Sequence, residues 1–283
     1  MARGAHLQVD WYDEPHAYDI VFAEDTRAEG RFLVEMLRVH GPKPKRGGQR
    51  RALEPACGSG RLVCELARRG LSVVGFDLND AMLDYARSKL RARKLRARLE
   101  HADMTNFRFE GRFDLVHCLV STFKYLLDEA SARAHLECVA RALRPGGIYV
   151  VGLHLSDYSR ATASQERWIA RRNGTLVTCV TRVEPAQRKS RLERVRTRLT
   201  IERGGKIART ETRWNFRTYD ARQFARLVAS VPEFECVALH DFHYEADVPR
   251  SLDDARADCV YVLRKRARAL SPERRLFRAS ARS

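Results

Sequence analysis

The sequence contains no long apolar run, and nowhere do apolar residues approach the roughly 18 consecutive positions that a membrane-spanning helix requires. Its first residues lack the apolar stretch of a secretory signal, because the acidic Asp10 and Asp13 come so early. We therefore expect a cytoplasmic protein without a membrane segment. The seven cysteines include no CxxC pair. Scattered cysteines without a nearby histidine cluster favour buried free thiols over a structural zinc site, so we expect no metal.

Charge, in contrast, is abundant and unbalanced. Lysine and arginine number 53 against 36 acidic residues, which gives a net charge of +17. Clustered basic side chains are typical of phosphate-binding surfaces, so a nucleic-acid partner is one hypothesis. Much of this charge is scattered and arginine greatly outnumbers lysine, which a compositional bias of the genome also explains. We favour a solvated surface over nucleic-acid binding. The basic clusters lie at residues 43–46, 91–98, 188–198 and 264–282.

Between residues 51 and 154, short apolar runs alternate with helical patterns, which predicts an α/β fold with a parallel sheet and crossover helices. The expected strands are residues 51–54, 71–77, 99–103, 113–118 and 148–154. The expected helices are residues 60–69, 81–93 and 130–143. A tight turn at residues 144–147 is expected to lead into the fifth strand.

The pattern changes beyond residue 156, where segments rich in Val, Thr and Ile alternate with polar residues. This alternation predicts an antiparallel sheet with one face in water. Its expected strands are residues 175–183, 192–202 and 207–216, with a turn at Gly204 and Gly205. A helix at 220–229 and strands at 235–240 and 258–264 would complete the main sheet. Residues 12–37, before the core, look helical.

The turn from Ala56 to Gly60 joins the first expected strand to the first helix. Its two glycines let the backbone approach a ligand, and the amides of a helix N-terminus attract negative charge. A Gly-x-Gly turn also occurs in dinucleotide sites. The dinucleotide motif includes a third glycine near position 63, where this chain has Val63.

Acidic residues follow the next two expected strands. Asp77 ends the second strand, where a carboxylate can accept both ribose hydroxyls of a nucleoside, so NAD and adenosylmethionine fit equally. Asp103 offers an acceptor for an adenine amino group, and Met104 offers an apolar side chain for the ring. Each carboxylate alone could be a helix cap or a solvated charge. Three signals in the expected order favour a nucleoside-containing cofactor.

In these segments the sequence resembles the class I S-adenosylmethionine-dependent methyltransferases, over about half of the chain. The similar segments are residues 53–60, 73–77, 102–104, 113–118 and 141–151. The resemblance implies an enzyme with a doubly wound, mostly parallel seven-stranded sheet. It also implies S-adenosyl-L-methionine as the cofactor.

The resemblance further implies a role for each matching residue. Ala56, Gly58 and Gly60 would line the methionine moiety, while Asp77 binds ribose and Leu78 packs on adenine. Asp103 and Met104 would hold the adenine edge, and Leu119 would flank the sulfonium. The expected cofactor-binding set is completed by Glu54, Cys57 and Met82. Cys57 stands where the family very often has a glycine, and its small size should do little harm.

The β-rich segment resembles that of small-molecule members of the superfamily, including amino-sugar and glycine-type N-methyltransferases, in which such an insertion covers the active site. We therefore expect methylation of an amine or hydroxyl of a small molecule. The expected parts are an N-terminal helical segment (1–50), a cofactor-binding core (51–155), a substrate-covering insertion (156–217), a C-terminal part of the core sheet (218–265) and a flexible basic tail (266–283).

Methyl transfer is an in-line displacement that needs alignment and, for an amine or hydroxyl, a proton acceptor. His154 is the first candidate, because it ends the fifth strand on the cofactor side and imidazole titrates near neutrality. Tyr12 is the second, since the family often has an N-terminal aromatic residue closing over the cofactor. A structural histidine and a packing tyrosine are the alternatives. Further candidates are Tyr18, Lys124, Tyr125, Asp157 and Tyr158.

Two rival functions remain, an RNA methyltransferase and a non-catalytic nucleic-acid-binding protein with the same fold. Both need an exposed stacking aromatic among the arginines, and the basic tail offers only Phe277. The Asn-Pro-Pro-Tyr or Asp-Pro-Pro-Tyr motif of exocyclic-amine DNA methyltransferases is absent. No Pro-Cys nucleophile of the cytosine-C5 type is present either. A small-molecule acceptor is therefore favoured.

Overall fold

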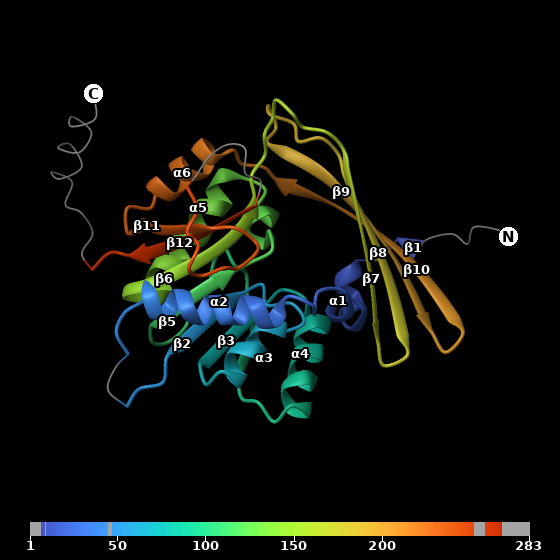
Figure 1. The fold of residues 1–283 in the computed structure, drawn as a ribbon, viewed down its shortest axis with the longest axis horizontal. Helices are drawn as coiled ribbons and strands as arrows, with labels where there is room; N and C mark the ends of the chain where they lie inside the picture. The colour runs from blue at the N-terminus through green and yellow to red at the C-terminus, as the bar shows by residue number, and fades with distance from the viewer. Residues whose placement is uncertain (1–6, 9, 45–46, 252–257, 268–283) are drawn as a thin grey trace.

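The structure is a computed structural model that describes residues 7–8, 10–44, 47–251 and 258–267. It contains a seven-stranded sheet covered by helices and, beside it, a five-stranded sheet (Figure 1). The predicted fold class, a mostly parallel α/β sheet with an antiparallel insertion, is confirmed. Among the described residues, no helix combines the length and the apolar character needed to cross a membrane.

The seven-stranded sheet has the order β11-β12-β6-β5-β2-β3-β4. From the central strand β2, the chain first builds outward to one edge and then returns through β5 to build toward the other. Such a reversal of strand order opens a crevice at the carboxyl ends of the strands, where doubly wound proteins bind ligands. The parallel strands are β2 (Arg51–Pro55), β3 (Ser72–Asp77), β4 (Arg98–His101), β5 (Phe113–Cys118) and β6 (Leu143–His154). The antiparallel strands are β11 (Phe234–His240) and β12 (Asp258–Lys265).

Helices cover both faces of this sheet (Figure 1). One face packs against α2 (Thr26–Val39), α3 (Arg61–Arg68) and α4 (Asp80–Ala92). The other packs against α5 (Glu129–Ala142) and α6 (Ala221–Ala229). β5 is buried along its whole length, and its apolar residues Phe113, Leu115, Val116 and Cys118 mark it as a central strand although Asp114 and His117 interrupt the run.

The prediction of one helical run at residues 12–37 was wrong in its continuity. The structure divides this region into a 3₁₀ turn (Trp11–Asp13), α1 (Pro15–Val21) and α2. Pro15 starts α1, as proline does at the first helical position. The chain then turns at Phe22, whose ring packs against Tyr18 and Trp11 with centroids 4.6 and 5.7 Å away. This break lets α1 face the five-stranded sheet while α2 packs on the core.

The five-stranded sheet has the order β1-β10-β9-β8-β7. Its strands are β1 (Leu7–Gln8), β7 (Ser164–Arg172), β8 (Thr175–Val183), β9 (Leu192–Arg203) and β10 (Lys206–Arg217). The predicted turn at Gly204 and Gly205 is present, with positive φ angles of 55° and 74° that suit a tight hairpin. Strand β7 was not predicted from the sequence, since most of its side chains are polar and exposed. Strand β1, which pairs with β10 in parallel, was not predicted either.

Two predicted element ends were also wrong. The expected turn at residues 144–147 belongs to β6, because Leu143 pairs with Phe113 and Ile148 with Leu115, with a register shift between these pairs. The third parallel strand ends at His101, so Asp103 lies beyond it in a short turn. The remaining predicted strands and helices differ from the observed ones only by a few residues at their ends.

A third apolar cluster joins α1 to the five-stranded sheet. Ile20 and Val21 of α1 pack with Val177 and Cys179 of β8 and with Leu199 of β9. The N-terminal helix therefore lies between the core and the insertion (Figure 1). The expected flexible tail falls almost wholly at residues 268–283, outside the described residues.

Candidate active site

The glycine turn between β2 and α3 is held in an unusual backbone conformation. Ala56, Gly58 and Gly60 have φ angles of 50°, 51° and 66°, a region that favours glycine. A Cβ atom on Gly60 would lie 2.7 Å from Cβ of Ala86 in α4, so glycine is required where the turn touches that helix. A Cβ atom on Gly58 would meet only Tyr18, at 3.9 Å. The turn is thus packed tightly on one side and open on the other.

Asp77 fixes this turn to the end of β3. Its carboxylate accepts hydrogen bonds from the backbone N–H of Gly58 at 2.7 Å and of Asn79 at 2.9 Å. Burial raises the pKa of Asp77, and the backbone hydrogen bonds oppose this rise. The next residue, Leu78, is 58% exposed. Asp77 and Leu78 therefore present a carboxylate and an apolar surface at neighbouring positions beside the glycine turn.

The other residues expected around adenine are more deeply engaged in the fold. Asp103 accepts hydrogen bonds from the backbone N–H and hydroxyl of Thr105, at 2.7 and 2.8 Å, so one of its oxygens caps a local turn. Met104 is buried in the core, and its carbonyl accepts a hydrogen bond from His135. Met82 is completely buried in α4, and its backbone N–H is capped by Asn79. The side chains of Met82 and Met104 are therefore buried packing residues.

A small cavity of about 40 Å³ lies between the glycine turn and the end of β5, where Leu119 lines it. Glu54 and Arg61 both line this cavity. Glu54 is only 8% exposed, and its Oε2 has no hydrogen-bond partner within the described structure. Burial raises the pKa of Glu54 to about 8. The guanidinium of Arg61 is held by Glu29 of α2, to which it donates two hydrogen bonds. A carboxyl group and a guanidinium thus converge on one small space.

Cys57 fits its position because Gly75 lies opposite. A Cβ atom on Gly75 would approach Sγ and Cβ of Cys57 to 3.1 Å, so the thiol fills the space that this glycine leaves. Burial raises the pKa of the Cys57 thiol well above its ordinary value, which keeps it protonated. The residue that departs from the family pattern is therefore a packing residue.

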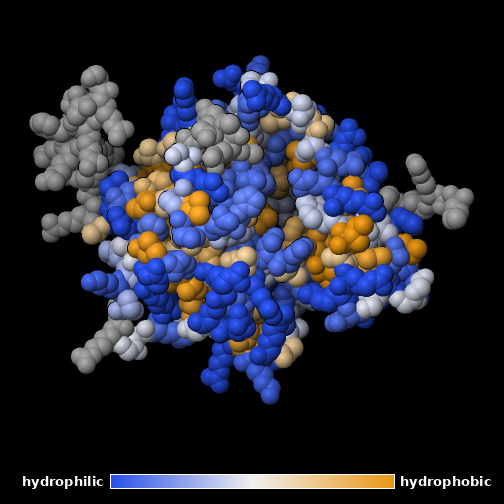
Figure 2. Space-filling view, viewed as in Figure 1, coloured by the Kyte–Doolittle hydropathy of each residue, from blue (hydrophilic) through white to orange (hydrophobic). Residues whose placement is uncertain are grey.

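A larger cavity of about 310 Å³ lies between the core and the five-stranded sheet, where the molecular surface is hollowed (Figure 2). It shares Tyr18, Phe22, Val120 and Thr122 with the small cavity, so the two are adjacent. Eight of its 21 lining residues are aromatic. The aromatic residues are Trp11, Tyr12, Tyr18, Phe22, Tyr125, Trp168, Trp214 and Phe216.

The charged residues of the larger cavity are mainly acidic. Glu166 on β7 and Glu193 on β9 line it, together with Lys124 from the turn after β5. Lys124 is 3% exposed, and its Nζ donates a hydrogen bond to Oε1 of Glu193 at 2.5 Å. The ammonium also lies 5.1 Å from the ring centroid of Phe216. Because this lysine is neutralised by Glu193, Glu166 leaves the cavity with an excess of negative charge.

The two residues predicted to accept a proton both line the larger cavity. His154 ends β6, and its Nδ1 lies 2.5 Å from Oδ1 of Asp258 on the neighbouring strand β12. The hydroxyls of Tyr12 and Tyr125 form a very short hydrogen bond. Burial raises the pKa of Tyr12 well above its ordinary value, so its phenol stays neutral. Nδ1 of His154 thus lies beside a carboxylate, whereas Tyr12 is a buried residue of the cavity wall.

The structure separates the other candidate residues. Tyr18, Lys124 and Tyr125 line the larger cavity, whereas Asp157 and Tyr158 are not part of its lining. The hydroxyl of Tyr158 hydrogen-bonds to Thr218 and Gln223. In the part of the chain that the structure describes, no cluster of three or more His, Cys, Asp or Glu residues could hold a metal ion.

Several site residues were not predicted from the sequence. Arg61 follows Gly60 directly, and a basic residue opening the helix was an available signal. Asp258, Glu166, Trp168 and Trp214 lie far from the glycine turn in the sequence, and no local pattern marks them. Glu166, Trp168 and Trp214 reach the cavity through the insertion, and strand pairing places Asp258 beside His154.

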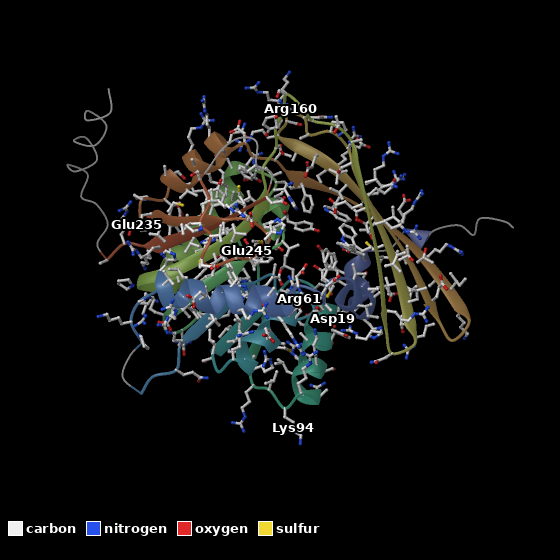
Figure 3. All side chains as sticks on the ribbon, in the orientation of Figure 1. Asp19, Arg61, Lys94, Arg160, Glu235 and Glu245 are labelled. Atoms are coloured by element: carbon white, nitrogen blue, oxygen red, sulfur yellow. The ribbon has the colours of Figure 1, made fainter. Side chains whose placement is uncertain are left out.

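Asp19 connects the three parts of the molecule that surround the site (Figure 3). This α1 residue is 2% exposed. It accepts hydrogen bonds from Oγ of Ser59 in the glycine turn at 2.8 Å, from Arg172 at the end of β7 at 2.6 Å, and from Lys89 in α4. Burial alone would raise the pKa of Asp19, but Lys89 and the other donors outweigh this effect and lower it. One carboxylate thus joins the turn, α1 and the insertion.

Replacing Asp19 with asparagine should lower the free energy of unfolding by about 1.5–3 kcal/mol, the usual worth of a hydrogen bond to a charged group. A carboxyl whose pKa is lowered by folding stabilises the native state above its ordinary pKa of about 3.9. That contribution is lost as the pH falls through the lowered value. The difference between Asp19→Asn and the unmodified protein in urea unfolding should therefore be full at pH 7 and shrink below about pH 4.

The matched control is Asp84→Asn, which breaks an exposed ion pair with Arg87 on α4. This change should alter stability by no more than about 0.5 kcal/mol. Equal losses for the two variants, or a difference that persists unchanged at low pH, would show that Asp19 is not the connection described above.

Comparison with known proteins agrees with this geometry. Residues 52–147 match the family model for a methyltransferase domain. A 148-residue segment is 33% identical to a dTDP-3-amino-3,6-dideoxy-alpha-D-glucopyranose N,N-dimethyltransferase of Streptomyces fradiae, covering 51% of this chain and 54% of that protein. A 203-residue segment is 27% identical to a related dTDP-amino-sugar N,N-dimethyltransferase of Streptomyces venezuelae, covering 70% and 81%.

Several of these matches span only about half of the relative's length. For example, the match to a putative methyltransferase of Geobacillus sp. strain WCH70 covers 48% of that protein. Among solved structures, Streptomyces venezuelae DesVI superposes with a TM-score of 0.73 at 20% identity, over 92% of this chain and 100% of that chain. This likeness concerns the fold, and it includes the five-stranded sheet. Residues 52–147 thus match a methyltransferase domain, and the chain as a whole has the fold of S-adenosylmethionine-dependent methyltransferases of known structure.

Proposed function

We propose that this protein transfers a methyl group from S-adenosyl-L-methionine to an amine of a small molecule. The observation that carries the proposal is the aromatic, acidic cavity of about 310 Å³ that adjoins the glycine turn. Cavities of this size take small molecules rather than polymers. Two curated relatives are named as N,N-dimethyltransferases of amino sugars, which supports the same class of acceptor.

The residues around the glycine turn suit the cofactor. Glu54 has a buried oxygen without a partner, and Arg61 lies across the same small cavity. Such a pair complements the ammonium and carboxylate of an amino acid. Asp77 would accept hydrogen bonds from the ribose hydroxyls, and the exposed Leu78 would cover one face of adenine. When bound, the cofactor supplies an electrophilic methyl group on a sulfonium.

The aromatic wall suits cations on both sides of the reaction. Trp11 and Trp214 stack with ring centroids 5.1 Å apart. Indole faces attract ammonium and sulfonium groups within about 6 Å. Glu166 adds a carboxylate on the same wall. An amine acceptor would be bound and oriented here, and alignment with the methyl group is the main requirement of an in-line displacement.

A protonated amine must lose a proton before its lone pair can attack the methyl group, and we assign His154 as the acceptor of that proton. Because Asp258 lies against Nδ1, the neutral imidazole would keep its proton on that nitrogen and leave Nε2 to accept another. The hydrogen bond with His154 lowers the pKa of Asp258, which keeps this carboxylate charged. Asp258 would thus fix the tautomer and steady the protonated imidazole.

The cavity lends no support to an RNA acceptor. A site for single-stranded RNA needs a basic groove in which aromatic side chains are interleaved. Among the described residues, the aromatic cavity holds one lysine, already bound to Glu193, and no arginine lines it. We therefore retain a small molecule as the acceptor.

The proposal is tested with methyl-labelled S-adenosylmethionine and a panel of acceptors. The panel contains amino sugars, free and as nucleotide conjugates, simple primary and secondary amines, their hydroxyl analogues and transfer RNA. Label should enter an amine and not its hydroxyl counterpart. Incorporation of label into RNA would contradict the proposal. So would the failure of every acceptor to take up label, together with the absence of cofactor binding in calorimetry.

Glu166→Gln should then lower kcat/KM for the identified amine by about tenfold, because one carboxylate near a partly desolvated cation is worth roughly 1–2 kcal/mol. The affinity for S-adenosylmethionine should be unchanged. Gln165→Glu is the matched control, since this neighbouring side chain points to the opposite face of β7. An equal and opposite effect of Gln165→Glu on kcat/KM would mean that Glu166 acts only through the overall electrostatic field.

A further inference from the structure

The outer face of the five-stranded sheet carries a row of arginines. Successive side chains of a strand point to opposite faces. On β9, Val195 faces the acceptor cavity, so Arg194 and Arg196 face outward. The strand register places Arg182 of β8 opposite Arg196, and Arg196 opposite Arg213 of β10. Three guanidinium groups therefore lie on three adjacent strands, at the same level.

Such a row is unfavourable by itself, because like charges directly opposite on neighbouring strands repel. In the described part of the chain, the ion pairs of this group are Arg194 with Glu184 at 3.0 Å and Arg213 with Glu211 at 2.6 Å. Neither Arg182 nor Arg196 has an ion pair there. The centre of the row thus keeps its positive charge without a carboxylate to balance it.

The row lines a depression of about 580 Å³. Arg182, Arg194, Arg196 and Arg213 surround it, with Asn215 and a single carboxylate, Glu184. This depression and the acceptor cavity lie on opposite faces of one sheet and share only Val195 and Trp214. None of these four arginines lines the acceptor cavity. The depression is therefore a second concave site of opposite charge.

We propose that this depression binds a small ligand that carries more than one phosphate group. Guanidinium groups bind phosphate oxygens through paired N–H donors, which suits a cluster of arginines. Neighbouring strands lie about 4.8 Å apart, so the row from Arg182 to Arg213 spans roughly 10 Å. A chain of phosphates offers each of the three arginines its own oxygens and carries more negative charge than one orthophosphate. Asn215 adds an amide donor at the edge of the depression.

A ligand bound at this outer face would also affect the acceptor site. Val195 and Trp214 line both concave surfaces, and Trp214 stacks on Trp11 and Tyr125 inside the cavity. A ligand that orders β8, β9 and β10 from outside would restrict the wall that holds the acceptor. Since all three tryptophans of the chain line that cavity, their fluorescence reports on such a change.

The test is calorimetric titration of the full chain with tripolyphosphate, at two salt concentrations, with the tryptophan emission recorded in parallel. Tripolyphosphate should bind more tightly than orthophosphate. Arg196→Ala should weaken binding about 10–100-fold, the loss expected when a hydrogen bond to a charged group is removed. Arg196→Lys should fall between, because it keeps the charge and loses the paired donors. Without ligand, the melting temperature of Arg196→Ala should equal or exceed that of the unmodified protein, since repulsion is relieved.

The matched control is Arg226→Ala, which removes an exposed arginine from α6, a helix that packs on the seven-stranded sheet and not on the five-stranded one. It should leave tripolyphosphate binding within a factor of two of the unmodified protein. Equal losses for Arg226→Ala and Arg196→Ala would mean a response to net charge only and would overturn the proposal. So would the absence of tripolyphosphate binding. A single-stranded RNA oligonucleotide that binds through Arg196 more tightly than tripolyphosphate would instead identify a nucleic-acid surface.

Discussion

Replacing Asp77 with alanine should weaken S-adenosylmethionine binding about 10²–10⁴-fold in a protein that still folds. Each hydrogen bond to a charged group is worth roughly 1.5–3 kcal/mol, and the ribose hydroxyls offer two. The carboxylate also accepts two backbone N–H groups, from Gly58 and Asn79. The substitution therefore removes a ligand contact and a support of the glycine turn together, and isothermal calorimetry measures the sum.

A second ligand separates these two effects. 5′-Methylthioadenosine contains the ribose and adenine but lacks the amino-acid part. If Asp77 contacts the ribose, both ligands should lose affinity by a similar factor in Asp77→Ala. If the carboxylate only holds the turn against the methionine moiety, 5′-methylthioadenosine should bind as before. Asp80→Ala is the matched control, because it removes an exposed carboxylate three residues further along the chain, at the start of α4. Wild-type affinity in Asp77→Ala would exclude this site.

The core was predictable from the sequence because its determinants are local. The buried strand β5 is mainly apolar, and the turn from Ala56 to Gly60 requires residues that accept a positive φ angle. Asp77 comes directly at the end of its strand. Each of these signals is contained within a few residues, so the order of strand, turn and helix could be inferred without tertiary information.

The acceptor site was not predictable in the same way. Tyr12 meets Tyr125 across 113 residues, and His154 meets Asp258 across 104. Strand β7 was missed because its side chains are largely polar, although Glu166 and Trp168 come from it. Even the predicted His154 could not be distinguished from a structural histidine until strand pairing placed Asp258 beside it. Residues from distant segments meet here, and only tertiary packing defines their chemistry.

Replacing His154 with alanine should lower kcat for the identified amine by about 10²–10⁴-fold, the usual contribution of a general base. The affinity for S-adenosylmethionine should not change, because His154 lines the larger cavity and not the glycine turn. Added imidazole should restore part of the rate, since it can occupy the vacated space and accept the proton. Single-turnover measurements with saturating cofactor separate this chemical step from product release.

Asp258→Asn tests how the histidine is held. The amide can no longer stabilise a protonated imidazole, so kcat should fall, but less than in His154→Ala, and the pH dependence of kcat should change.

Tyr12→Phe is the control for the cavity wall. It keeps the ring that packs against Tyr18, 5.5 Å between centroids, and removes only the hydroxyl that binds Tyr125. Its kcat should stay within a few-fold of the unmodified protein, because the pKa of this buried phenol is raised too far for it to act as a base. If instead Tyr12→Phe is inactive while His154→Ala retains its rate, the proton leaves through the tyrosine pair, and the histidine with Asp258 serves only to join β6 to β12.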